Sequence, residues 1–156
     1  FDDAIIKYLR RKYNLLVGER TAEELKVNIG SAVQREDVIT AEVTGRNLVS
    51  GLPKTISVTS TDIYEAIREP TQALIEVIQG VLEHTPPQLT TDVFNDGIIL
   101  TGGGAQLEGL SEAVYDFLHV PCGVADDPQT SIAIGCGRVV DDLKLMQHLL
   151  TKVGRH

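Results

Sequence analysis

The clearest chemical signal in the sequence is a run of three glycines directly after an apolar segment. Residues 97–101 are predicted to form a strand, and Gly102, Gly103 and Gly104 follow it before Ala105. Each ordered glycine costs about 0.5–1 kcal/mol relative to alanine, so the run indicates either positive φ angles or a need for bare backbone. It is either a tight turn packed against protein or a place where backbone approaches a ligand such as a nucleotide. The glycines alone leave both interpretations open.

The glycine run fits neither of two common phosphate-binding patterns. A P-loop requires a Lys-Ser or Lys-Thr pair after its glycines, and none follows here. The dinucleotide fingerprint requires a third glycine where this chain has Leu107. The sequence offers no other phosphate-binding loop, so we expect this chain to form only part of any ligand site.

Two other sets of reactive residues have a structural explanation. Asp126 and Asp127 could form a carboxylate pair or a metal site, but their position before Pro128 favours a turn and helix start. The two cysteines, Cys122 and Cys136, have no metal-ligand spacing and do not suggest a disulfide framework. A reducing cytoplasm is therefore the expected compartment.

Composition narrows the possible partners. The 156 residues carry 14 basic and 22 acidic side chains, a formal net charge of −8. A nucleic-acid surface would need a concentrated basic face, so nucleic acid is not an expected partner. No apolar run approaches the roughly 20 residues that a membrane span needs. The chain begins at Phe1 without an initiator methionine, and we interpret it as a piece of a longer protein.

The first part of the chain predicts a small α+β subdomain over residues 1–69. An apolar stripe indicates a helix over residues 3–13. A capping-box pattern at Thr21–Glu24 predicts a second helix that ends at Gly30. Alternating residues predict strands over 38–43 and 54–59, joined by a loose hairpin loop over 45–52.

The remaining residues, 70–156, predict a base α/β subdomain. Ser60 is the expected N-cap of a long helix from Thr61 to Glu83, with a kink or restart at Pro70. After one helical turn over 88–93, strands over 97–101 and 122–125 alternate with helices over 109–118 and 131–143. This rhythm is typical of a sheet flanked by helices, on which the first subdomain is an insertion.

Several segments carry a resemblance to a known family. Residues 99–105 resemble the adenosine motif of the actin and Hsp70 ATPase superfamily. Residues 13–26, 51–56 and 82–87 closely resemble the MreB rod-shape-determining proteins, which are bacterial actins, and residues 126–137 match that family's second connecting motif. The resemblance covers nearly the whole chain. It implies an α/β actin-like ATPase fold, with a ribonuclease H-like sheet flanked by helices and the small α+β subdomain inserted.

The resemblance also implies a nucleotide site. In the family, two lobes close on ATP and magnesium, and this chain is similar to the second lobe only. The glycine turn would pack along the nucleotide, and charged side chains on the helix opened by Thr21 would meet the ribose and adenine. By themselves these charged residues would be a solvated helix face, and the sequence does not say which glutamate points inward. The implied nucleotide-binding residues are Glu23, Glu24, Lys26, Thr101, Gly102, Gly103, Gly104 and Ala105.

The implied function is that of an ATP-binding cytoskeletal protein. It would polymerise into membrane-associated filaments in the cytoplasm and direct cell shape and cell-wall synthesis. Its partners would be other copies of itself, cell-wall elongation proteins and, through the other lobe, the inner membrane face.

The catalytic loops of the family would precede Phe1. This chain alone is therefore expected to lack catalytic and metal-binding residues, to bind nucleotide feebly at best and to hydrolyse no ATP, whereas the intact protein would be a weak ATPase. The alternatives are the second lobe of a division or pilus-assembly ATPase, or of a sugar-kinase-like enzyme.

Overall fold

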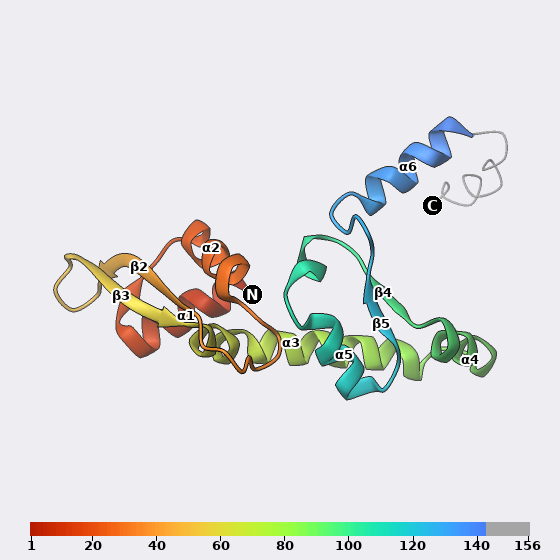
Figure 1. The fold of residues 1–156 in the computed structure, drawn as a ribbon, viewed down its shortest axis with the longest axis horizontal. Coiled ribbons are helices and arrows are strands. Elements are labelled where there is room, and N and C mark those ends of the chain that lie inside the picture. Colours follow the sequence, from red (N-terminus) through yellow and green to blue (C-terminus); the bar gives the residue numbers. More distant parts are fainter. Residues whose placement is uncertain (143–156) are drawn as a thin grey trace, which may run out of the picture.

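The computed structural model describes residues 1–142. Its first elements form a compact layer of two helices against an antiparallel sheet (Figure 1). They are α1 (Asp2–Tyr13), β1 (Leu15–Leu16), α2 (Glu19–Ile29), β2 (Thr40–Asn47) and β3 (Pro53–Thr59). The strands pair antiparallel in the order β1-β2-β3. The α+β character predicted for this part of the chain is confirmed.

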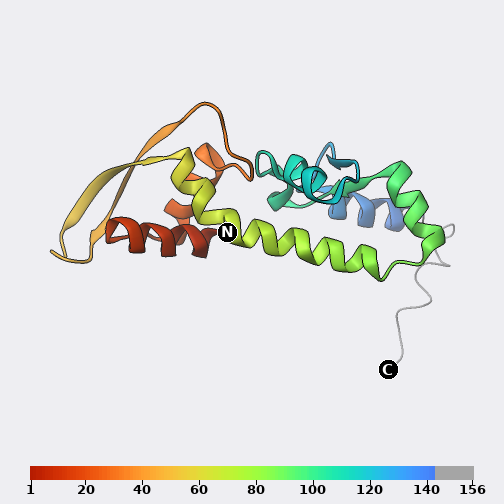
Figure 2. The same cartoon turned by 90° about the horizontal axis from the view of Figure 1, so that it is seen from below.

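A single long helix, α3 (Ser60–Glu83), connects the two halves of the chain (Figure 1). Its N-cap is Thr59 and not Ser60, because the Thr59 hydroxyl accepts a hydrogen bond from the Asp62 amide at 3.2 Å and the Asp62 carboxylate accepts one from the Thr59 amide at 2.9 Å. Ser60 is instead the first helical residue. Pro70 lies inside the helix without ending it, and Figure 2 shows the helix axis changing direction after its first turns. The predicted kink is thus present, but α3 does not restart.

The second half turns back at α4 (Pro87–Asp96), at the far end of α3, and lies alongside the C-terminal part of that helix (Figures 1 and 2). Its elements are α4, β4 (Ile98–Leu100), the short 3-10 helix η1 (Gly103–Gln106), α5 (Leu110–Leu118), β5 (Cys122–Val124) and α6 (Ser131–Asp141). Strands β4 and β5 pair in parallel, with α5 in the connection between them, which confirms the predicted strand–helix alternation. The last residue of the helix predicted over 131–143, and the tail after it, lie outside the described residues.

Most of the buried apolar side chains belong to one cluster in the first half. It is centred on Ile5 and Leu9 of α1, Val58 of β3, and Ile63 and Ile67 of α3, all of them fully buried. Leu107 and Leu110 join the same cluster from the second half. Because α3 and these leucines span both halves, the division at residues 69 and 70 stays a prediction. Within residues 1–142, no helix is both long and apolar enough to cross a membrane.

Three predicted boundaries were wrong, one because of strand pairing and two because of local features at a helix start. Helix α2 begins at Glu19 because Ala22 N already donates to Gly18 O at 3.1 Å, so Thr21 lies inside the first turn and caps nothing. Strand β2 starts at Thr40 and runs on to Asn47, since β1 pairs with its last residues and β3 with the rest. Helix α4 has ten residues where one turn was predicted, because Pro87 is accommodated at its start.

A buried carboxylate near the start of α3 accepts hydrogen bonds from side chains of α1. Asp62 is only 4% exposed and accepts hydrogen bonds from Lys12 Nζ at 2.7 Å, Tyr8 Oη at 3.2 Å and Tyr13 Oη at 3.0 Å. Burial opposes ionisation of Asp62, but the hydrogen bonds from Lys12, Thr59 and Tyr13 outweigh it and lower its pKa to about 2. Burial and a hydrogen bond to Glu65 raise the pKa of Tyr8 to about 12. The charged Asp62 is therefore the centre of the junction between the two helices.

Gly109 is expected to tolerate no side chain. It caps α5 with φ of 72°, and a Cβ there would lie 2.5 Å from Val33 Cγ2 and 3.2 Å from Ser31 Oγ. We expect Gly109→Ala to lower the free energy of unfolding by about 2–4 kcal/mol, from the left-handed backbone and the overlap together. Urea denaturation of this chain measures it. The matched control is Gly80→Ala in α3, where no atom lies within 4 Å, and a gain of about 0.5–1 kcal/mol is expected. Equal effects of the two variants would contradict this prediction.

Candidate functional site

A cavity of about 380 Å³ lies where α2 faces the glycine turn. Its lining combines residues from both halves of the chain. From the first half come Phe1, Glu23, Lys26, Val27 and Gly30, and from the second Gly103, Gly104, Gln106, Leu107, Glu108 and Gln129. The folded chain thus brings together two of the segments that the sequence singled out.

The glycine turn presents bare backbone to this cavity. Gly102 leaves β4 with φ of 85°, a conformation that favours glycine, and its amide donates to Pro128 O at 2.6 Å. Gly103 and Gly104 then line the cavity, and a Cβ on either would meet no atom within 4 Å. Thr101, Gly102 and the buried Ala105 are not among the lining residues. Of the five residues predicted here, two face the cavity and Gly102 shapes the turn.

The phase of α2 decides which charged residues face the cavity. Glu23 and Lys26 are three residues apart, so they share one face of the helix, and both line the cavity. Glu24 is turned away and pairs with Arg20 Nε at 3.0 Å on the exposed surface. The question that the sequence left open has a structural answer: Glu23 is the glutamate that faces inward.

Several cavity residues carried no signal in the sequence. Gln129 Nε2 donates to Gln106 Oε1 at 2.7 Å, although 23 positions separate the two residues. Asp2 of α1 reaches Lys26 Nζ at 2.8 Å. Glu108, just before the Gly109 turn, is paired with Arg35. None of these contacts is local along the chain, so neither periodicity nor motif spacing could indicate them.

The chemistry of the lining suits a neutral, hydroxyl-bearing ligand more than a bare phosphate. The carboxylate of Glu23 and the side-chain amides of Gln106 and Gln129 are acceptors for hydroxyl and amino groups, whereas the Glu108 carboxylate is already paired with Arg35. Lys26 is the single cation among the lining residues of the described chain, and it is already paired with Asp2. The open space at Gly103 and Gly104 leaves room for a flat group against the backbone.

The described residues do not form a metal site. Across residues 1–142, no group of three or more His, Cys, Asp or Glu side chains is placed to hold a metal ion. Asp127 fits the structural role that the sequence favoured, because its carbonyl oxygen accepts hydrogen bonds from the amides of Thr130 and Ser131 at the start of α6.

Comparison with known proteins gives a consistent result. Residues 1–148 match the family model described as MreB/Mbl protein. The chain is 41% identical over 143 residues to the cell shape-determining protein Mbl of Bacillus cereus, covering 92% of this chain and 43% of that protein. It is 42% identical over 141 residues to the cell shape-determining protein MreB of Escherichia coli K12, covering 90% of this chain and 41% of that protein.

Solved structures agree with the sequence relatives. The crystal structure of MreB5 of Spiroplasma citri bound to ADP superimposes with a TM-score of 0.88 at 32% identity, over 92% of this chain and 44% of that one. The MamK double helical filament matches with a TM-score of 0.67 at 20% identity, over 82% of this chain and 39% of that one, which shows the fold alone. The predicted α/β actin-like fold is confirmed.

The chain spans about two fifths of the length of the relatives it matches. The family match nevertheless covers residues 1–148 and the identity to two of its members exceeds 40% over nine tenths of the chain. This chain therefore belongs to the MreB/Mbl family.

Proposed function

We propose that this chain forms one wall of the ATP or ADP site of an actin-like cell-shape protein. The observation that carries the proposal is the cavity in which Gly103 and Gly104 face Glu23 and Lys26. The relatives in Bacillus cereus and Escherichia coli are named cell shape-determining proteins. MreB5 of Spiroplasma citri has been crystallised with ADP and with AMPPNP.

The residues of the cavity fit the nucleoside part of such a ligand. The Glu23 carboxylate and the amide oxygens would accept hydrogen bonds from ribose hydroxyls and a base amino group. The glycine backbone would lie against the ligand where any side chain would take up its space. Thr101, Gly102 and Ala105 would act indirectly, by holding the turn in place, and Glu24 would remain outside.

The magnesium ligands and the phosphate-binding groups would come from another part of the intact protein. Within residues 1–142 no group of three or more His, Cys, Asp or Glu side chains is placed to hold a metal ion, and these residues have no assigned role in ATP hydrolysis. We propose that the part of the family's length outside this chain supplies the phosphate loops, the magnesium ligands and the catalytic groups. Contacts with cell-wall elongation proteins and with the inner membrane face, and a cytoplasmic location, belong to the same proposal.

We further propose that copies assemble head to tail through two unlike surfaces. The hairpin tip, residues 44–55, exposes Leu48, Val49 (82% exposed) and Leu52 and carries Arg46 and Lys54 with no acidic residue. The α4 end, residues 83–96, exposes Leu89 and Phe94 (53% exposed) and carries three acidic residues and no lysine or arginine. Their charges and apolar side chains are complementary.

These two surfaces lie at opposite ends of the longest axis of the molecule (Figure 1). A head-to-tail contact between unlike surfaces at opposite ends repeats as an open filament when the rotation between successive copies does not close a ring. The arrangement therefore supports the proposal that copies of the protein polymerise, as part of its proposed cell-shape function.

The test uses the intact protein. Equilibrium binding of ADP and ATP, followed by electron microscopy with ATP, should show nucleotide binding and filaments. A monomer that phosphorylates a sugar would favour the sugar-kinase alternative, and a protein that binds no nucleotide would overturn the proposal.

Reversing the charge of the hairpin tip should impair assembly. With Arg46→Glu and Lys54→Glu together, like charges face each other across the contact, and we expect the critical concentration for polymerisation to rise about tenfold or more. Sedimentation measures it. Adding Asp92→Lys and Asp96→Lys should restore assembly, whereas the equally large reversal Lys7→Glu with Arg10→Glu on exposed positions of α1 should have little effect. Unchanged assembly of the tip variant would show that another surface makes the contact.

A further inference from the structure

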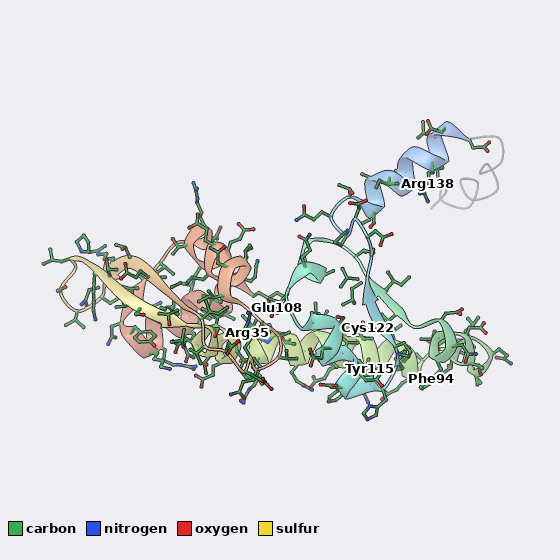
Figure 3. All side chains as sticks on the ribbon, in the orientation of Figure 1. Arg35, Phe94, Glu108, Tyr115, Cys122 and Arg138 are labelled. Carbon is green, nitrogen blue, oxygen red and sulfur yellow. The ribbon has the colours of Figure 1, made fainter. Side chains whose placement is uncertain are left out.

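An ion pair connects the two walls of the cavity, one formed by α2 and the other by the glycine turn. The guanidinium of Arg35, in the connection between α2 and β2, pairs with the carboxylate of Glu108, which follows η1. Figure 3 shows the two labelled residues next to each other between the two halves of the chain. Arg35 is largely covered, with 21% of its side chain exposed, and Glu108 is more open at 58%. The pair thus connects segments that are 73 positions apart in the sequence.

Backbone hydrogen bonds also connect the two segments that carry this ion pair. Ser31 forms an isolated parallel bridge with Glu108, and Ala32 N donates to Glu108 O at 2.7 Å. Ser31 directly follows Gly30, which ends α2, and both Gly30 and Glu108 line the cavity. The ion pair therefore acts close to the point where the α2 wall joins the wall formed by the glycine turn.

We propose that Arg35 and Glu108 are positioning residues for the nucleotide. Their ion pair sets the separation between Glu23 and Lys26 on one wall and Gly103 and Gly104 on the other. Arg35 is not among the residues that line the cavity, so it would act through Glu108 and the backbone beside it. This inference rests on the proposed nucleotide site.

A positioning role and a simple charge effect predict opposite results for one variant. If the two charges acted only through their long-range field on an anionic nucleotide, Arg35→Gln would weaken binding and Glu108→Gln would strengthen it. If the pair positions the walls, both variants remove the same contact and both weaken binding. The Kd of adenosine, which carries no charge, should then rise by about the same factor as the Kd of ADP.

The experiment measures the Kd of ADP and of adenosine for the intact protein and its variants. We expect Arg35→Gln and Glu108→Gln each to raise Kd by about three- to tenfold. The double variant should have a Kd no higher than that of the single variant that binds more weakly, because both substitutions remove the same contact. The swapped pair, Arg35→Glu with Glu108→Arg, should return to within about twofold of wild type. Glu76→Gln removes the same charge from an exposed position on α3 and should bind as wild type. Thermal unfolding identifies any variant that has lost its fold, and Arg35→Met, which removes the charge but keeps a long aliphatic side chain, then replaces Arg35→Gln.

The outcomes separate the two proposals. Wild-type affinity in both single variants, or tighter binding by Glu108→Gln, would overturn the positioning role and leave the nucleotide site standing. A wild-type protein that binds neither ADP nor adenosine would overturn both. Weaker binding by both single variants, together with recovery in the swapped pair, would support the positioning role.

Discussion

Gly104→Val is expected to weaken binding of ADP to the intact protein by about 100-fold or more, equivalent to about 3 kcal/mol, with little change in stability. Gly104 lines the cavity, and a Cβ there would meet no protein atom within 4 Å. Its φ is not among the positive values of the chain, so a valine at this position does not have to adopt the left-handed backbone conformation. The new side chain would therefore cost the fold little and would occupy space that the ligand needs.

The matched control for this variant is Gly123→Val. Gly123 lies in β5, where valine is a favourable residue, and it also has no atom within 4 Å of its Cβ position. It does not line the cavity, so affinity for ADP should stay at the wild-type value. Isothermal titration gives the affinities, and urea denaturation gives the stabilities. If Gly104→Val bound ADP as tightly as wild type, the glycine turn would not be the wall against which the nucleotide lies.

Asp62→Ala is expected to destabilise the protein by about 2–4 kcal/mol. The substitution removes the Asp62 half of the capping box, the carboxylate that accepts from the Thr59 amide, and with it the acceptor shared by Lys12 and Tyr13. Loss of a capping hydrogen bond costs about 1 kcal/mol, and hydrogen bonds to a charged, buried group contribute about 1.5–3 kcal/mol. Urea denaturation measures the change. Glu76→Ala, at an exposed position of the same helix, should stay within about 0.5 kcal/mol of wild type. An effect of Asp62→Ala as small as that of this control would show that the junction between α1 and α3 contributes little.

Stability should also depend on pH through Asp62. Its pKa in the folded protein, about 2, lies below the ordinary value of 3.8. A lowered folded pKa contributes stability that is complete above the unfolded pKa and is lost as the pH falls. We therefore expect about 2 kcal/mol of stability to disappear between about pH 4 and pH 2. In Asp62→Asn this component should be absent, and a wild-type profile parallel to that of the variant over this range would contradict the assignment.

Local patterns in the sequence were sufficient to locate the main elements. A capping-box pattern at Thr21 and a glycine stop placed α2 to within about two residues of its start at Glu19 and at its end, and the glycine run after β4 marked a wall of the cavity. These signals are read within a few positions of each other, so they need no tertiary information. The ligand itself came from the resemblance to a family, because three glycines fit a packed turn as well as a binding wall.

Features that depend on distant segments could not be predicted in the same way. Glu23 and Glu24 are equivalent in the sequence, and only the rotation of α2 against the second half separates them. Asp62 is an ordinary polar residue near a helix start until α1 brings Lys12 to it. The pairing of Arg35 with Glu108 likewise requires the fold, because nothing in either neighbourhood specifies the other.

The most direct test of the nucleotide site is a structure of the intact protein with ADP, by crystallography or electron cryomicroscopy. The predicted result is ADP in the cavity, with its nucleoside against the backbone of Gly103 and Gly104 and within hydrogen-bonding distance of Glu23. ADP bound at any other place, with this cavity empty or filled by protein, would contradict the central claim that α2 and the glycine turn form the nucleotide-binding wall.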